Sequence, residues 1–265
     1  LDRNDELLCL RPEGTVGCVR AAVQNGLISQ GSIKKLWYMG SMFRYERPQR
    51  GRHRQFNQIG IEVFGEEGAE VELEILLLCD RIWRNLNIEH LVELEINTIG
   101  DPDSRKSYVI SLASYLQKYS DDLDDDSKRR LNTNPLRILD SKDKKTQEIL
   151  SDAPNFMDFV DYASRGHFEK LCNSLEGVGI RYTVNVALVR GLDYYNRTVF
   201  EWTTKELGAQ GTICGGGRYD GLVEKISNKS SPAVGCAFGI ERLVMLIKSL
   251  SSQENQSESV GDVYI

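Results

Sequence analysis

Four arginines stand close together in a short stretch between two predicted strands. They are Arg47, Arg50, Arg52 and Arg54, and they surround Pro48 and Gly51 without a lysine among them. A guanidinium group offers a planar fork of N–H donors that matches the oxygens of phosphate and carboxylate groups. The stretch therefore predicts a site for an anionic ligand, although an arginine-rich loop can also be an ordinary solvated surface.

The two strands that must position this loop are predicted at 36–44 and 55–64. Successive residues of a strand point to opposite faces, so the second strand has two different faces. One face is mostly apolar and is expected to pack, and it carries Asn57, Ile59, Ile61 and Val63. The other face carries Phe56, Gln58, Gly60, Glu62 and Phe64. Because Gly60 leaves space against the backbone, this second face predicts the floor of a binding site. The alternative is the solvated edge of a sheet.

The overall composition fits a globular protein of one large domain or two smaller ones. The chain has 265 residues, of which 40% are hydrophobic, and a net charge of -6. This acidic balance argues against a surface coated with nucleic-acid-binding charge, but the local basic cluster is compatible with a nucleic-acid partner. No apolar run in the sequence reaches the length of a membrane span.

The cysteines and histidines show no spacing typical of metal ligands. The six cysteines are Cys9, Cys18, Cys79, Cys172, Cys214 and Cys236, with no CxxC pair among them. We therefore expect no metal site and no disulfide framework. Reduced thiols of this kind are typical of a cytoplasmic protein.

The hydrophobic patterns predict an α+β protein whose core is interrupted. Residues 1–99 are expected to form the first part of the core, 100–175 a mostly helical insertion, 176–250 the second part, and 251–265 a polar linker. Helices are predicted at 15–27, 70–86, 103–119, 156–175 and from 239, and further strands at 92–99, 182–189, 198–203 and 233–238. The acidic run 121–126 is expected to be a solvated face. The first residue opens in the middle of a pattern and 263–265 look like the start of a strand, so we expect a piece of a longer protein.

Five segments, taken in order, carry a family resemblance. They are LRPEGT (10–15), FRYERPQRGRHRQFNQIGIEVFG (43–65), LVRGLDYYN (188–196), GGGRYDGL (215–222) and GCAFGIERL (235–243). Together they resemble the histidyl-tRNA synthetases, which are class II aminoacyl-tRNA synthetases. The FRYER and GIERL segments look like class II motifs two and three, and LVRGLDYYN points to the histidine enzyme. The resemblance covers essentially the whole chain, but motif one and the C-terminal anticodon-binding domain of the family are missing, and 263–265 look like the first strand of that domain.

The resemblance implies an antiparallel sheet flanked by helices, with a helical insertion, and a ligase with three substrates. Histidine would attack ATP to give histidyl-adenylate, and the histidyl group would then pass to the 3′ end of tRNA-His. Magnesium is expected on the outer phosphates of ATP. The full-length protein is expected to be a cytoplasmic homodimer.

The resemblance also assigns the catalytic arginines. Arg44 matches the residue that grips the α-phosphate of ATP, and Arg52 looks like a contact for the terminal phosphates. Arg242, in the first turn of the last predicted helix, matches the arginine that covers adenine and touches the γ-phosphate. Arg190 looks like the family's distinctive arginine, which bridges the histidine carboxylate and the α-phosphate.

Adenine and histidine have their own matched residues. Glu46 matches the position that reads the adenine amino group, Phe56 matches the ring on which adenine stacks, and Gln49 is a candidate contact for the acceptor stem of tRNA. The imidazole ring, with one donor and one acceptor nitrogen, is expected between Glu62 and Tyr195. The remaining matched residues of the histidine pocket are Glu13, Thr15, Gln58, Arg190, Tyr194, Gly215, Gly217 and Tyr219.

Several alternatives remain open at this point. Glu13 could simply stabilise a helix start, Arg190 and Arg242 could be structural ion-pair partners, and Tyr194 could be a core residue. The glycine cluster 215–217 could be an ordinary tight turn. The alternative functions are a regulatory subunit of the ATP-phosphoribosyltransferase type, a module that senses uncharged tRNA, and a class II enzyme for another amino acid. The retained arginines, with Glu62 and Tyr195, favour the ligase.

Overall fold

A seven-stranded sheet forms the centre of the molecule in the computed structural model, which describes residues 7–28, 31–45, 48, 51–139, 141–208 and 211–254. The strand order is β1-β2-β7-β6-β5-β3-β4. Neighbouring strands are antiparallel except for the parallel pair β3 and β4. The strands are β1 Lys34–Phe43, β2 Gln55–Phe64, β3 Glu93–Thr98, β4 Tyr182–Val184, β5 Asn196–Thr203, β6 Thr212–Arg218 and β7 Ala233–Gly239. The predicted α+β sheet is therefore confirmed.

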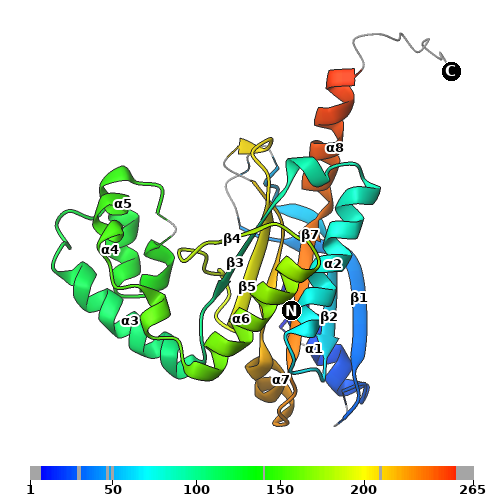
Figure 1. Ribbon diagram of the computed structural model, residues 1–265, viewed down its shortest axis with the longest axis horizontal. Helices are drawn as coiled ribbons and strands as arrows, with labels where there is room; N and C mark the ends of the chain where they lie inside the picture. Colours follow the sequence, from blue (N-terminus) through cyan, green and yellow to red (C-terminus); the bar gives the residue numbers. More distant parts are fainter. Residues whose placement is uncertain are drawn as a thin grey trace.

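One face of the sheet is covered by α2 and α6, which lie side by side across the strands (Figure 1). These helices span Glu70–Asn85 and Tyr162–Gly177, and α8 spans Ile240–Glu254. Their apolar residues pack with the sheet in one buried cluster that includes Trp83, Leu171 and Phe238. The helices form because their apolar residues recur at helical spacing and give each helix one buried stripe.

A second buried cluster joins α1 and α7 to other strand residues. These helices span Thr15–Gln24 and Asp220–Ser227. The cluster includes Val19, Phe64, Val199 and Tyr219. Because Phe64 and Val63 are neighbours on β2 but belong to different clusters, β2 is buried on both faces at this end.

The helical insertion stands beside the sheet, in the green part of the ribbon (Figure 1). It contains α3 Pro102–Gln117, α4 Asp125–Leu131, α5 Lys144–Ser151 and two short 3-10 turns, Pro135–Ile138 and Phe156–Asp158. Aspartates cap these helices and α6 by accepting hydrogen bonds from backbone N–H groups, and they are Asp101, Asp124, Asp143 and Asp161. Its helical character agrees with the sequence, whereas the domain limits at 100 and 175 stay a prediction, and α6 itself packs on the sheet.

Three local predictions were wrong, and one alternative is excluded. The helix predicted at 156–175 begins only at Tyr162, because Asp161 caps it there. Strand β4 ends at Val184 rather than at 189. The alternative of a tight turn at 215–217 is excluded, because these glycines lie inside strand β6. Asp124 in the acidic run is no solvated charge, because it accepts a hydrogen bond from Thr146 Oγ1 at 3.1 Å as well as those of its cap, which lower its pKa to about 2 against the effect of desolvation.

The C-terminal prediction can be followed only in part. Helix α8 runs to Glu254, beyond the start of the predicted linker at 251, and the residues after 254 lie outside the described part. Among the described residues, no helix combines the length and the apolar character that crossing a bilayer requires.

Candidate active site

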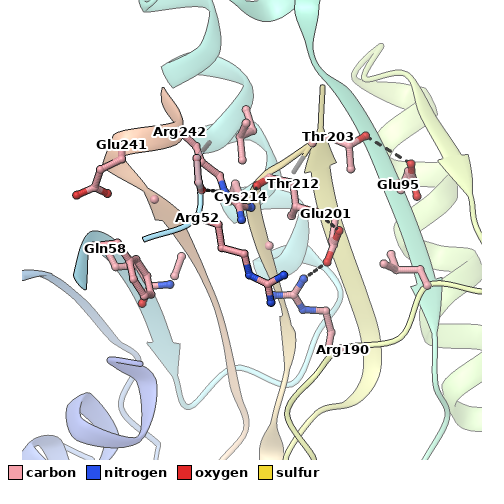
Figure 2. Close-up of a pocket in the computed structure, with 18 of the residues that line it drawn as sticks. Arg52, Gln58, Glu95, Arg190, Glu201, Thr203, Thr212, Cys214, Glu241 and Arg242 are labelled. Carbon is pink, nitrogen blue, oxygen red and sulfur yellow. Dashed lines mark hydrogen bonds and ion pairs between the residues drawn. The ribbon is translucent and has the colours of Figure 1, made fainter. Parts of the chain in front are cut away.

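A cavity of about 810 Å³ opens over the sheet, between β2, β5, β6, the segment 185–190 and the start of α8 (Figure 2). Charged side chains of both signs line it. They are Arg44, Arg52, Lys142, Arg190 and Arg242, and Glu95, Glu201 and Glu241. The cross-strand register sets Glu201, Gly215 and Ala237 in one row, so small residues form the floor beside a carboxylate.

Arg190 lies directly on this floor. A Cβ atom at Gly215 would come within 2.5 Å of an Arg190 nitrogen, so a larger residue there would displace the guanidinium from this position. Arg190 forms an ion pair with Glu201, and its guanidinium carbon lies 5.7 Å from the centroid of the Tyr195 ring. Burial opposes its charge, but nearby Tyr195 and Glu201 outweigh that effect and raise the pKa of Arg190. Its buried Nε has no hydrogen-bond partner among the described residues, so Arg190 is paired but not saturated.

Arg44 lies over the aromatic ring predicted for adenine. Its guanidinium carbon is 4.8 Å from the centroid of Phe56, and its Nε donates a hydrogen bond to the carbonyl of Pro12 at 3.0 Å. A cation over an aromatic face is worth about 0.5–1 kcal/mol at an exposed site. The interaction is therefore weak enough for a ligand ring to replace it.

The start of α8 is attached to the loop and to the sheet. Arg242 Nε donates to the carbonyl of Gly51 at 3.0 Å, and another of its nitrogens donates to the carbonyl of Thr212. The neighbouring Glu241 accepts hydrogen bonds from the backbone N–H of Asn57, at 2.8 and 3.0 Å, and from its side-chain amide. These contacts fix the helix N-terminus, whose dipole favours anions, at the mouth of the cavity.

Glu62 lies apart from the cavity in a buried cluster of hydroxyl groups. Its carboxylate is 1% exposed and accepts hydrogen bonds from Tyr219 Oη at 2.5 Å, Thr15 Oγ1 at 2.7 Å and Tyr38 Oη at 3.2 Å. Burial raises the pKa of Glu62 to about 8, although the three hydrogen bonds act in the opposite direction. The polar face of β2 is thus no solvated sheet edge at this end.

Tyr38 is a site residue that the sequence did not single out. Its ring lies against both Gly14 and Gly60, where an added Cβ atom would collide with it. The space expected for a ligand over Gly60 is therefore filled by Tyr38, and that expectation was wrong for this structure. The register of the β1–β2 hairpin sets Tyr38 directly opposite Gly60. An aromatic residue opposite a glycine on a predicted hairpin is the signal that could have found it.

The comparisons with known proteins place this arrangement in a family. Residues 1–250 match the tRNA synthetase class II core domain (G, H, P, S and T). The chain belongs to this class II tRNA synthetase core family. Its mixed sheet with flanking helices is the fold of a class II synthetase core.

Solved structures of class II synthetases resemble the chain along most of its length. The crystal structure of apo S. aureus histidyl-tRNA synthetase superposes with a TM-score of 0.74 and 35% identity, covering 94% of this chain and 60% of that one. A histidine--tRNA ligase subunit from Alicyclobacillus acidocaldarius shows a TM-score of 0.58 and 23% identity, covering 96% of this chain and 80% of that one. An ATP phosphoribosyltransferase regulatory subunit/histidyl-tRNA synthetase from Bacillus halodurans shows a TM-score of 0.60 and 23% identity, covering 93% of this chain and 67% of that one. The latter two support the class II fold alone, and this chain spans 60% of the length of the S. aureus structure.

The class II core divides the predicted site residues into two groups. The cavity brings together Arg44, Arg52, Phe56, Gln58, Arg190, Gly215 and Arg242. The hydroxyl cluster around Glu62 contains Thr15 and Tyr219, and the rings of Tyr194 and Tyr195 pack beside Tyr219 with centroids 5.7 and 6.4 Å away. Gly217 is buried in β6, and the predicted Glu46 lies outside the described residues, as does Gln49.

Two alternatives for single residues find structural support. The Glu13 carboxylate accepts hydrogen bonds from the backbone N–H groups of Thr15 at 2.7 Å and Val16 at 3.1 Å, so it stabilises the start of α1. Tyr194 packs against the second core cluster. The carboxylates Glu95, Glu201 and Glu241 were missed, because acidic residues inside otherwise ordinary strands and helix starts carry no pattern of their own.

Proposed function

We propose that this class II core belongs to a histidine--tRNA ligase, which activates histidine with ATP and transfers it to the 3′ end of tRNA-His. The observation that carries the proposal is the meeting of Arg44, Arg190 and Arg242, from three distant segments, on one cavity. The 35% identity with the S. aureus histidyl-tRNA synthetase supports the choice of amino acid. The cavity volume of about 810 Å³ is within the range of nucleotide-sized sites.

The triphosphate of ATP is the anion that these arginines fit best. In the proposal, Arg44 binds the α-phosphate, Arg52 the outer phosphates and Arg242 the γ-phosphate. Adenine would stack on Phe56, which requires Arg44 to leave the face of that ring and turn its fork to the phosphate. Arg44 therefore has to move when ATP binds, whereas the contacts of Arg242 with the carbonyls of Gly51 and Thr212 hold that arginine at the cavity beforehand.

Histidine would lie at the other end of the cavity, towards the buried hydroxyl cluster. Gln58 Oε1 is a buried acceptor without a hydrogen-bond partner among the described residues, and the ammonium group of an amino acid would satisfy it. Glu62 and Tyr195 are proposed to hold the two imidazole nitrogens, with Thr15 and Tyr219 fixing the Glu62 carboxylate. Glu13 is proposed to lie near the ammonium group while its carboxylate still accepts the hydrogen bond from the backbone N–H of Thr15 at the start of α1.

The residues around the cavity also fit Mg²⁺. Three carboxylates, Glu95, Glu201 and Glu241, line the same cavity as the arginines, and oxygen ligands are those that Mg²⁺ prefers. Bound mainly through ATP oxygens, the ion would neutralise charge on the leaving pyrophosphate. The chain's own contribution is positional, because Arg190 can hold the histidine carboxylate against the α-phosphate while Glu201 keeps its guanidinium on the floor.

The test is ATP–pyrophosphate exchange with each of the twenty amino acids. We expect exchange with histidine and not with the others, since a site that hydrogen-bonds a side chain rejects analogues about 10⁴-fold. Exchange with a different amino acid would overturn the specificity. Charging of tRNA-His transcripts then tests the transfer step, and sedimentation of the full-length protein tests the proposed homodimer.

A regulatory subunit of the ATP-phosphoribosyltransferase type is the second candidate. Two contacts favour it: Arg190 is already paired with Glu201, and Tyr38 fills the space over Gly60. Histidine binding by calorimetry together with a complete lack of exchange would decide for this candidate. The tRNA-sensing module and another amino acid are excluded by the same experiment if histidine alone supports exchange.

A further inference from the structure

Three buried cysteines from three different elements meet beneath the sheet. Cys79 lies on α2, Cys214 on β6 and Cys236 on β7. Their sulfur atoms all lie within 4.8 Å of one another, and the Cys79 and Cys236 sulfurs are 3.9 Å apart. The linear spacing of these residues gave no sign of such a cluster, because the three thiols meet only in the folded sheet. The expectation of no metal site, drawn from that spacing alone, stays a prediction.

The sheet register explains how the cluster forms. Gly216 on β6 pairs with Cys236 on β7, and Cys214 lies two residues before Gly216 and so on the same face. Gly216 has no side chain, and an added Cβ atom would collide with backbone atoms of β7. The two thiols therefore approach diagonally across the bare glycine, and Cys79 completes the triangle from the buried stripe of α2.

The surroundings of the cluster are apolar. Cys79, Cys214 and Cys236 are 0%, 1% and 3% exposed, and they belong to the core cluster that contains the aromatic rings of Trp83, Trp202 and Phe238. The group of potential ligands among the described residues consists of these three sulfurs, without a carboxylate or an imidazole. Hard cations require oxygen ligands, whereas thiolates select soft ones.

We propose that Cys79, Cys214 and Cys236 form a three-sulfur site for a soft d¹⁰ cation, and that Cu(I) fits it best. Two sulfurs bound to a shared ion at about 2.3 Å lie roughly 3.8–4.0 Å apart. The 3.9 Å between Cys79 and Cys236 already meets this requirement. Cys214 needs a shift of less than one ångström to complete a trigonal arrangement, since no sulfur pair exceeds 4.8 Å.

Charge and coordination number favour Cu(I) over Zn(II). Structural zinc is almost always bound by four ligands, whereas three sulfurs complete a trigonal shell for Cu(I). Two thiolates and one thiol around Cu(I) leave a net charge of minus one, and each thiol that becomes a thiolate releases its proton to solvent.

Cys214 also links the cluster to the cavity. It is a lining residue of the cavity over the sheet as well as a member of the cluster. Because neighbouring residues of a strand face opposite sides, its thiol lies on the face away from Gly215 and the cavity floor. Binding would join α2 to the two strands that carry the cavity floor.

The test is an anaerobic titration of the whole chain with Cu(I), in competition with a chromophoric Cu(I) chelator. We expect one tightly bound ion, and X-ray absorption should show sulfur neighbours only. Cys79→Ser, Cys214→Ser and Cys236→Ser should each lower the affinity at least 100-fold. Cys9→Ser and Cys172→Ser are the matched controls, because these thiols lie outside the cluster, and they should bind as the unchanged chain does.

Folding of each variant is checked by circular dichroism. If a serine variant does not fold, alanine at the same position replaces it, as in Cys79→Ala. Equal affinity in the cluster variants and the unchanged chain would overturn the proposal. So would nitrogen or oxygen neighbours in the absorption spectrum, or loss of binding in the controls. Cadmium supplies an independent measurement, since the ultraviolet sulfur-to-metal band should disappear in Cys214→Ser and persist in Cys172→Ser.

Discussion

Two arginine–glutamate pairs serve opposite purposes in this molecule. Arg218 and Glu72 are both 0% exposed, whereas Arg190 and Glu201 are 20% and 18% exposed at the cavity. Each pair joins a strongly basic side chain to a carboxylate on a neighbouring element. The difference between them is the number of hydrogen bonds that remain to be made.

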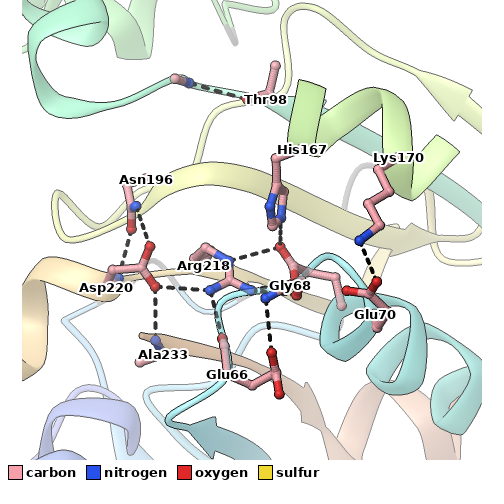
Figure 3. Close-up of polar contacts among 12 residues, drawn as sticks. Glu66, Gly68, Glu70, Thr98, His167, Lys170, Asn196, Arg218, Asp220 and Ala233 are labelled. Atoms are coloured by element: carbon pink, nitrogen blue, oxygen red, sulfur yellow. Dashed lines mark hydrogen bonds and ion pairs between the residues drawn. The ribbon is translucent and has the colours of Figure 1, made fainter. Parts of the chain in front are cut away.

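Arg218 has a partner for every N–H group (Figure 3). Its nitrogens donate to both Glu72 oxygens at 3.0 and 2.6 Å, to the carbonyls of Glu66 and Gly68 at 3.1 Å, and to Asp220 at 3.2 Å. His167 Nε2 adds a contact of 2.6 Å to Glu72. Arg190, in contrast, keeps a buried Nε without a partner among the described residues. A saturated arginine stabilises the fold, and an unsaturated one over a bare glycine is available to a ligand.

The largest effect on stability is expected when the saturated pair of Arg218 and Glu72 is broken. Arg218→Met leaves Glu72 buried without its main partner, which costs about 3–5 kcal/mol of unfolding free energy. Urea unfolding followed by circular dichroism measures it. The double variant Arg218→Met with Glu72→Met removes both charges and should recover much of the loss. A loss below about 1 kcal/mol for the single variant would show that the pair contributes little.

Removing the unsaturated arginine should affect chemistry instead. Arg190→Ala is expected to lower histidine-dependent ATP–pyrophosphate exchange about 10³-fold, or roughly 4 kcal/mol, because in the proposed function Arg190 donates to the reacting groups. Its urea midpoint should change little, since Glu201 keeps the hydrogen bond from Thr212 at 2.7 Å. Arg190→Lys keeps the charge without the fork and is the conservative comparison. Near-normal exchange by Arg190→Ala would make Arg190 a second structural arginine.

Glu62 lies between these two cases, because hydroxyl groups rather than an arginine satisfy it. Its pKa of about 8 lies above the usual value of 4.5, so between these values the folded chain holds a proton that the unfolded chain releases. Stability from this group is present below about pH 4.5 and is lost as the pH rises towards 8. As the pH rises from 5 to 8, the unfolding free energy of the unchanged chain should therefore fall by about 3 kcal/mol relative to that of Glu62→Gln.

Thermal or urea unfolding at both pH values tests this difference, because other titrating groups contribute equally to both proteins. A parallel pH dependence of the two chains would show that Glu62 is charged in the folded state. Glu62→Ala should also weaken histidine binding more than ATP binding, measured by calorimetry. An equal loss of both affinities would remove Glu62 from imidazole recognition.

The smallest effect concerns a partly exposed arginine that holds the segment after Arg190. Arg105, on α3, donates to the Asp193 carbonyl at 3.1 Å and to its carboxylate at 3.2 Å. Asp193 is 78% exposed, so Arg105→Ala should cost at most about 1 kcal/mol of stability. Exchange should fall only a few-fold. A loss as large as that of Arg190→Ala would mean that the insertion positions the catalytic segment.

The sequence predicted local structure best where one pattern decided it. Strand 55–64 was located to the residue, because its alternation and the preceding loop agree. The sequence could not distinguish the structural Arg218 from the predicted pocket residues beside it. A motif gives residue types, but it does not give the number of hydrogen-bond partners that each residue has in the fold. Tyr38 over Gly60 and the cysteine cluster depend on the register between distant strands. The roles of the predicted site residues stay predictions, although the cavity contains seven of them.

The position of β7 determines when this sheet can be completed during synthesis. The ribosome makes the β1–β2 hairpin early, but its partner in the sheet is the strand Ala233–Gly239, which also pairs with β6. Until that strand emerges, one edge of β2 has no sheet neighbour and can pair with a foreign strand. The nascent chain therefore exposes this edge while residues 65–232 are made, and closing so long a loop slows folding.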